Sequence, residues 1–255
     1  MKKILFIICL LIPAALLCQN SSKIIPGYLG KRWVIDYTLN FLPSITLINP
    51  GANSEYNSFR SGSTEFHVNT QHKFSVERVV GRKFSVVGTV LFSRSQADID
   101  VSSSSVQDFI QVKSRGYIFT LRQYRKHLAP ISKYFDYKIG YYSITPEDFD
   151  YSVDDFENGT TSGTISAGST GDFYMGFGFG NSRVIADRVI FSLGFEVGLL
   201  LGGMFDTFDN STQFRGIDTD SPNSLQNRDA LHSSARERVF FESLANFTVR
   251  LGFMP

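Results

Sequence analysis

Residues 239–253 read VFFESLANFTVRLGF, and this stretch indicates the fold. Apolar side chains occupy its odd positions, interrupted once by Ser243, and polar or small side chains occupy most even positions from Glu242 onward. A period of two is typical of a β-strand with one apolar and one polar face. Strands of soluble proteins are usually about 5–6 residues long, whereas a tilted strand that crosses a bilayer needs roughly 9–11. The stretch therefore predicts a membrane strand from Val239 to Phe253 that closes an outer-membrane barrel.

Seven further segments show the same alternation and complete a set of eight strands. They are residues 33–41, 65–77, 84–92, 116–122, 134–141, 173–180 and 189–201. Segment 84–92 is apolar on both faces, so its inward and outward positions stay undecided. Its orientation does not change the number of predicted strands.

The links between these segments indicate the topology. Long polar links alternate with short ones, which is the pattern of bacterial outer-membrane barrels with long outside loops and short periplasmic turns. The long links are residues 43–63, 95–109, 145–171 and 205–235, and the short ones are 80–83, 126–133 and 181–188. The prediction is an all-β, transmembrane, antiparallel up-and-down barrel of eight strands, beginning near Gly27 and ending at Phe253. A soluble β-sandwich is disfavoured, because its strands are shorter and its loops lack this rhythm.

The N-terminal residues predict export from the cytoplasm. Lys2 and Lys3 precede an apolar run, which is the pattern of a secretory signal peptide at residues 1–18 followed by a barrel domain at 19–255. A lipoprotein signal with Cys18 lipidated is the alternative, and the large Leu17 disfavours it. The run is shorter than the ~20 residues of a membrane-spanning helix. Because Cys9 and Cys18 both lie in the signal, the mature chain would have no disulfide, zinc–cysteine site or cysteine nucleophile.

Three segments carry a family resemblance. Residues 128–141, LAPISKYFDYKIGY, resemble a turn and strand of small outer-membrane barrels from Bacteroidetes-type bacteria, and residues 247–253, FTVRLGF, are similar to their closing strand. The opening residues 26–32, PGYLGKR, resemble their first strand. The resemblance implies an eight-stranded architecture like that of OmpA and OmpX in the cell outer membrane. It covers the barrel frame and none of the long loops, and it implies no catalytic motif.

The predicted inward face is charged. Its charged residues form a candidate lumen network: Asp36, Lys73, Glu77, Arg122, Asp136, Lys138, Glu196 and Arg250. Glu242, His67, Asn69 and Gln71 are assigned to the same face. Eight strands enclose an interior just wide enough for side chains to fill, and buried charges are tolerated only when they pair. This favours a closed, salt-bridged lumen, and a narrow polar path for ions or a small solute is the alternative.

Two further features bear on catalysis and metal binding. The third long link is acidic and includes Asp148, Asp150, Asp154 and Asp155, which are candidates for a cation-binding loop. Because the spacing of a calcium-binding loop is absent, a solvated loop with a flexible tail at 159–164 is preferred. His72 is predicted to face outward, and no serine and carboxylate can be placed beside it to form a catalytic group.

These observations predict a non-enzymatic outer-membrane protein that supports envelope integrity or surface contact. A lipid-modifying barrel enzyme that uses His72 is a third, less favoured reading. The expected partners are outer-membrane lipids, lipopolysaccharide and the barrel-assembly machinery, while the surface ligand is not indicated. The formal net charge of +1 gives no sign of nucleic-acid binding, and no cofactor or metal is expected.

Overall fold

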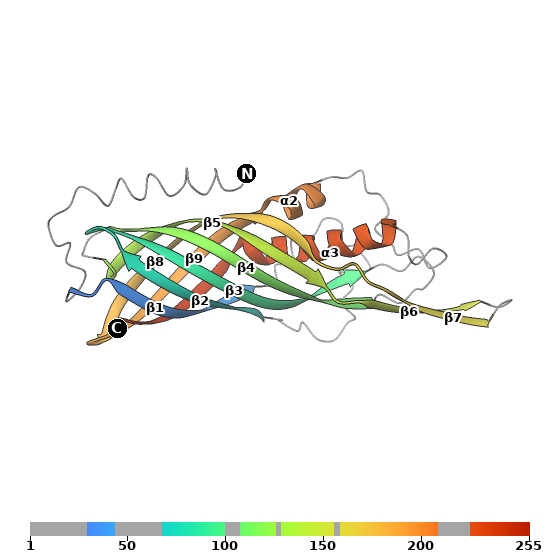
Figure 1. Ribbon diagram of the computed structural model, residues 1–255, viewed down its shortest axis with the longest axis horizontal. Coiled ribbons are helices and arrows are strands. Elements are labelled where there is room, and N and C mark those ends of the chain that lie inside the picture. The colour runs from blue at the N-terminus through green and yellow to red at the C-terminus, as the bar shows by residue number, and fades with distance from the viewer. Residues whose placement is uncertain (1–29, 44–67, 100–107, 126–128, 156–158, 209–224) are drawn as a thin grey trace, which may run out of the picture.

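The computed structural model describes residues 30–43, 68–99, 108–125, 129–155, 159–208 and 225–255. Eight of its strands close into one antiparallel barrel in the order β1-β10-β9-β8-β5-β4-β3-β2 (Figure 1). They are β1 (Trp33–Pro43), β2 (Val68–Val79), β3 (Phe84–Ile99), β4 (Asp108–Tyr124), β5 (Ser132–Pro146), β8 (Thr170–Ala186), β9 (Val189–Leu200) and β10 (Asn246–Phe253). The prediction of an all-β, eight-stranded antiparallel barrel is confirmed.

Several sequence predictions concern residues outside the described set. The predicted signal peptide, both cysteines and the predicted start near Gly27 lie outside it. The first described strand begins at Trp33. Its partner β10 ends beside it, because Ile35 pairs with Phe253 in the closing register.

Alternation along each strand separates a polar interior from an apolar exterior. The outward positions of β8, for example, are exposed aromatic and aliphatic side chains such as Phe173, Met175 and Phe177. The undecided strand β3 takes the same arrangement, since Val87 and Leu91 are buried and Phe92 is exposed. Large apolar side chains are exposed on all eight barrel strands, which is the reverse of a soluble barrel.

The C-terminal stretch is half helix, so the predicted strand from Val239 is wrong in its first half. Helix α3 (Leu225–Leu244) runs through the start of the stretch, and β10 begins only at Asn246. Within α3, Leu231, Ala235 and Val239 are buried at intervals of four residues, the spacing of one helix face. Over a few residues a helical stripe and a strand alternation both fit the same sequence, and here packing favours the helix.

Helix α3 fills the barrel end that lies opposite the short turns (Figure 1). It packs against β1, β3, β5 and β9, which stand on different sides of the barrel. Its buried face joins the largest apolar cluster, together with inward side chains such as Leu91, Tyr142 and Leu200. The predicted long link over 205–235 is therefore partly helical, and it acts as a plug at this end.

The short helix α2 (Leu201–Phe208) continues directly from β9. The buried Asp172 carboxylate accepts hydrogen bonds from Gly202 N and Gly203 N, at 2.7 and 2.8 Å. It therefore satisfies two amides of the first turn, which have no partner within the helix. In the part of the chain that the structure describes, no helix combines the length and the apolar character needed to span a membrane.

Two other predicted loops contain strands. In the link at 95–109, the described residues continue β3 and β4, whose pairing runs out to Ile99 and Asp108. The acidic link contains a hairpin, β6 (Phe149–Asp155) and β7 (Gly159–Ile165), which projects beyond the barrel (Figure 1). The predicted flexible tail at 159–164 is thus strand, because each of its residues pairs across the hairpin.

The opposite end of the barrel is closed by short turns and two small apolar clusters. Val34, Ile190 and Met254 form one cluster. The other contains Val79, Ala129 and two tyrosines, Tyr124 and Tyr134. Both barrel ends are therefore apolar inside, and the charged residues lie between them.

Candidate functional site

The eight charged residues of the candidate lumen network all meet inside the barrel. They come from six strands, namely β1 (Asp36), β2 (Lys73, Glu77), β4 (Arg122), β5 (Asp136, Lys138), β9 (Glu196) and β10 (Arg250). Seven of them are buried, and Lys138 is partly buried. Because inward positions alternate with outward ones, each strand delivers these side chains to the same enclosed space.

One half of the network is centred on Glu196. Lys73 Nζ donates to both of its carboxylate oxygens, at 2.8 and 3.0 Å, and Lys138 Nζ donates to Oε2. The hydroxyl of Tyr174 donates to Oε1 at 2.8 Å. A single buried carboxylate therefore holds two ammonium groups and a phenol from β2, β5 and β8.

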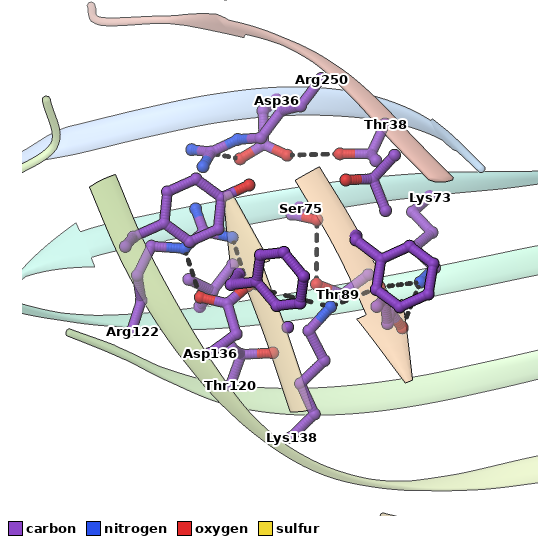
Figure 2. Close-up of a pocket in the computed structure, with 17 residues that line it drawn as sticks. Asp36, Thr38, Lys73, Ser75, Thr89, Thr120, Arg122, Asp136, Lys138 and Arg250 are labelled. Carbon is purple, nitrogen blue, oxygen red and sulfur yellow. Dashed lines mark hydrogen bonds and ion pairs between the residues drawn. The ribbon is translucent and has the colours of Figure 1, made fainter. Parts of the chain in front are cut away.

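The other half is centred on Arg122. Its Nε and Nη2 donate to the two oxygens of Asp136 at 2.7 and 2.8 Å, and its Nη1 donates to Glu77 at 2.9 Å. Arg250 Nη2 contacts the same Glu77 and lies 3.1 Å from Asp36 Oδ2. Figure 2 shows Asp36, Arg122, Asp136 and Arg250 converging across the barrel interior. A bidentate arginine–carboxylate pair constrains orientation as well as charge.

The two halves form one layer whose charges balance. Lys138 Nζ lies 3.8 Å from Asp136 Oδ2 and so links them. Four carboxylates face four cationic groups in this layer. Pairing of this kind offsets the large cost of removing each charge from water.

Little free space remains among these side chains. The cavity between them has a volume of about 40 Å³, and one water needs roughly 10–15 Å³ of such space. Arg250 lines the cavity, and its Nε and Nη1 have no protein partner. The space therefore suits two or three waters that complete these hydrogen bonds, and it is too small for an organic solute.

Four inward tyrosines belong to this region and were not singled out from the sequence. Tyr124 and Tyr134 lie on the turn side of the network, where Tyr124 donates to Glu77 at 2.7 Å and Tyr134 stacks with Arg122 at 4.3 Å from its ring centroid. Tyr142 and Tyr174 lie on the α3 side. Glycines at neighbouring inward positions were the sequence feature that could have indicated these tyrosines. Gly176 and Gly198, for example, leave space for the ring of Tyr174.

The other polar residues assigned to the lumen have different positions. Glu242 lies on α3, where it pairs with Arg238 at 3.1 Å, so its assignment to a strand is wrong. Gln71 is buried and accepts a hydrogen bond from Asn40 at 3.0 Å. His67 and the side chain of Asn69 lie outside the described residues.

The acidic link does not bring its carboxylates together among the described side chains. Asp148 and Asp150 are exposed, and Asp150 accepts a hydrogen bond from Thr164 at 2.6 Å. The side chains of Asp154 and Asp155 lie outside the described set. No group of three or more potential metal ligands occurs in the described part of the chain.

His72 lies on the outer face, as its position in β2 predicted. Its Nδ1 is hydrogen-bonded to the hydroxyl of Tyr37 at 2.6 Å, and its flanking register partners are Leu39 and Phe92. The hydroxyls of Ser85 and Thr89 on the neighbouring β3 both face inward, where they bond Glu77 and Ser75. The histidine therefore has a tyrosine partner and no hydroxyl nucleophile from β3.

Basic side chains gather on the outer surface at the short-turn end. We call this surface the turn rim. Among the described residues, nine basic side chains and one acid lie on it: Lys31, Arg32, Arg78, Arg82, Lys83, Arg125, Lys133, Arg183 and Arg188, with Asp187. The whole chain has 25 basic and 24 acidic residues, so the rest of the molecule is net acidic.

Comparisons with known proteins add a distant fold likeness. The sequence matches no protein-family profile and no curated protein. Among solved structures, the chain is similar to the crystal structure of Ail, the attachment invasion locus protein of Yersinia pestis, in complex with the heparin analogue sucrose octasulfate. The TM-score is 0.32 and the identity 10%, over 87% of this chain and 94% of that one. A likeness at this level carries no inference about ligand or activity.

Proposed function

We propose that this chain is a non-enzymatic outer-membrane barrel protein whose lumen is closed and whose function lies on its surface. The observation that carries the proposal is the inverted distribution of side chains: apolar rows face outward on every barrel strand, and charges are paired inside. Soluble monomers rarely expose a contiguous apolar patch larger than about 300–600 Å². A bilayer is the solvent that suits such an exterior.

Three further observations support the outer-membrane location. The strand number is even, short turns gather at one end, and the closing register of Ile35 with Phe253 puts the first and last strand ends at that same end. These are the features of bacterial outer-membrane barrels, whose short turns face the periplasm. The predicted signal peptide at residues 1–18 would supply export, and the barrel-assembly machinery would insert the chain.

A closed lumen is supported by three successive layers. The clusters around Val34 and Val79 close the turn end, the charge-balanced network fills the middle, and α3 fills the other end. The cavity of about 40 Å³ within the network has room for waters only. A solute would have to displace α3 and separate several buried ion pairs.

With a closed lumen, the function of the barrel would lie in contacts made by its surface. The hairpin β6–β7 and the extended β3–β4 pair project on the side opposite the turn rim (Figure 1). In an outer membrane this side faces the cell exterior, where it would meet lipopolysaccharide and external ligands. A rigid barrel that holds projecting hairpins would support the envelope or display them for contact.

A narrow ion channel is the alternative, and conductance separates the two functions. Refolded protein is first checked for heat-modifiable migration on a gel and for a β-rich circular dichroism spectrum, and is then added to planar bilayers. We expect folded protein without resolved unitary currents. Steady currents that change in Glu196→Gln and persist unchanged in Glu147→Gln, an exposed acid outside the lumen, would favour the channel. Protein that stays soluble and monomeric without detergent would contradict the membrane location itself.

A further inference from the structure

We propose that the turn rim binds phospholipids of net negative charge in the membrane leaflet on the short-turn side. This inference rests on the proposed membrane location and adds a ligand class to it. The rim is strongly basic in a chain whose total charge is close to neutral. A one-sided cluster of this kind creates a local positive potential.

Two of the rim cations continue outward rows of the barrel and so lie toward the headgroup layer of a surrounding bilayer. Arg78 continues the exposed outward row of β2 after Phe74 and Val76, and Lys133 begins the outward row of β5 that leads to Tyr137. Both of these apolar rows thus end in a cation at the turn side. Charged groups immediately beyond an apolar belt meet lipid headgroups before they meet soluble molecules.

Trp33 marks the same boundary. Trp33 is 46% exposed, and the guanidinium of Arg78 lies 5.2 Å from the ring centroid. Tryptophan favours the membrane–water interface, where one part of the ring is apolar and the other is wet. The cation over it would therefore lie at the level of lipid phosphates.

Among the described residues, the rim cations have almost no carboxylate partners. Lys31 Nζ donates to the Pro255 oxygen at 2.6 Å, and in the described part of the chain no ion pair joins another rim cation to a carboxylate. Arg82, Lys83 and Arg188 hold their turns through backbone carbonyls, which accept from Ala129, Tyr124 and Met254. Their charged ends are exposed and available to a ligand, and the turns do not depend on them.

The experiment uses the single tryptophan of the chain as a local reporter. Protein is refolded into phosphatidylcholine vesicles that contain a small fraction of chain-brominated phosphatidylglycerol or chain-brominated phosphatidylcholine, and quenching of Trp33 fluorescence is compared. We expect phosphatidylglycerol to quench more strongly at low salt, and this preference to shrink at high salt because screening weakens exposed charges.

Two matched triple variants test whether the preference for phosphatidylglycerol depends on the charges of the turn rim. Arg82→Gln/Lys83→Gln/Arg188→Gln removes three rim charges but leaves Arg78 over the reporter. We expect it to lower the phosphatidylglycerol preference by about threefold or more, since each basic residue near an anionic surface contributes up to about a fivefold effect. Arg94→Gln/Lys113→Gln/Arg115→Gln removes three exposed charges on β3 and β4 away from the rim, and should leave the preference unchanged.

The outcomes separate this inference from the proposed function. Folded protein quenched equally by both lipids overturns lipid binding by the rim and leaves the membrane location standing. If such protein also binds soluble polyglutamate through the rim charges, the rim belongs to a soluble acidic partner. Protein whose Trp33 is quenched by neither lipid contradicts the membrane location as well.

Discussion

Lys73 on β2 donates to both carboxylate oxygens of Glu196 on β9, at 2.8 and 3.0 Å, across the interior of the barrel. Strands β1 and β10 separate these two strands in the sheet. The pair therefore joins parts of the wall that share no backbone hydrogen bonds. It becomes a contact only when the barrel closes.

Neutralising Glu196 should destabilise the barrel strongly. Glu196→Gln leaves Lys73 and Lys138 facing each other without their shared carboxylate, and loss of one partner from a buried pair costs about 3–5 kcal/mol. Urea unfolding of the refolded protein in lipid vesicles measures this loss. Glu147→Gln is the control, because its pair with Lys113 is exposed and 3.5 Å long, and should cost less than about 1 kcal/mol. Equal losses in the two variants would mean that the network contributes no more than a surface pair.

The space around Tyr174 makes Gly198 sensitive to a single methyl group. A Cβ at Gly198 would lie 2.3 Å from Tyr174 Cε2, so Gly198→Ala must move the ring away from Glu196. We expect a loss of about 1–3 kcal/mol in unfolding free energy. Gly88→Ala is the matched strand control, with nothing within 4 Å of the added carbon, and should change stability by no more than about 0.5 kcal/mol. A neutral Gly198→Ala would show that Tyr174 is not held in this position.

A charged side chain on the outer face should lower the free energy of unfolding more, the deeper its position lies in the bilayer. Phe195 packs between the outward rings of Phe179 and Phe247, at centroid distances of 5.6 and 5.3 Å. Phe195→Arg should cost about 2–4 kcal/mol in vesicle unfolding experiments. Gln111→Arg, at an exposed position of β4 beyond the apolar rows, should be close to neutral.

The neighbouring residue gives the converse test. A Cβ at Gly194 would lie 2.7 Å from Thr248 Oγ1, so Gly194→Arg should prevent folding, scored as loss of the heat-modifiable band. A harmless Phe195→Arg combined with unfolded Gly194→Arg would indicate that the outer face is not in contact with lipid.

His72 should have no catalytic role. It has Tyr37 as its hydrogen-bond partner, but a nucleophile and an orienting acid are both needed for triad chemistry. Cells that express the wild-type chain or His72→Ala should contain chemically identical lipid A and phospholipids by mass spectrometry. Tyr37→Phe, which removes the partner hydroxyl, should give the same result. An acyl change that vanishes in His72→Ala would establish an enzyme.

The sequence alone determined the barrel and its two faces. The alternation of apolar and polar residues over runs such as 189–201 predicts which face of a strand is outside the barrel and which is inside. It does so because successive side chains of a strand project to opposite faces. The eight strands and the inward location of Asp36, Lys73 and Arg250 follow from this local rule. The outward position of His72 follows in the same way.

Only the tertiary structure decided which charges pair and what fills the barrel. Glu196 contacts Lys73 and Lys138 because strand order and register place three segments, distant in sequence, at the same height along the barrel axis. No local sequence pattern specifies that height. The helix at Val239 could not be predicted from local alternation either, because the residues VFFES fit both the apolar stripe of a helix and the alternation of a strand. The helix forms where Leu231 and Ala235 can pack inside the closed barrel, and that environment exists only after the strands have assembled.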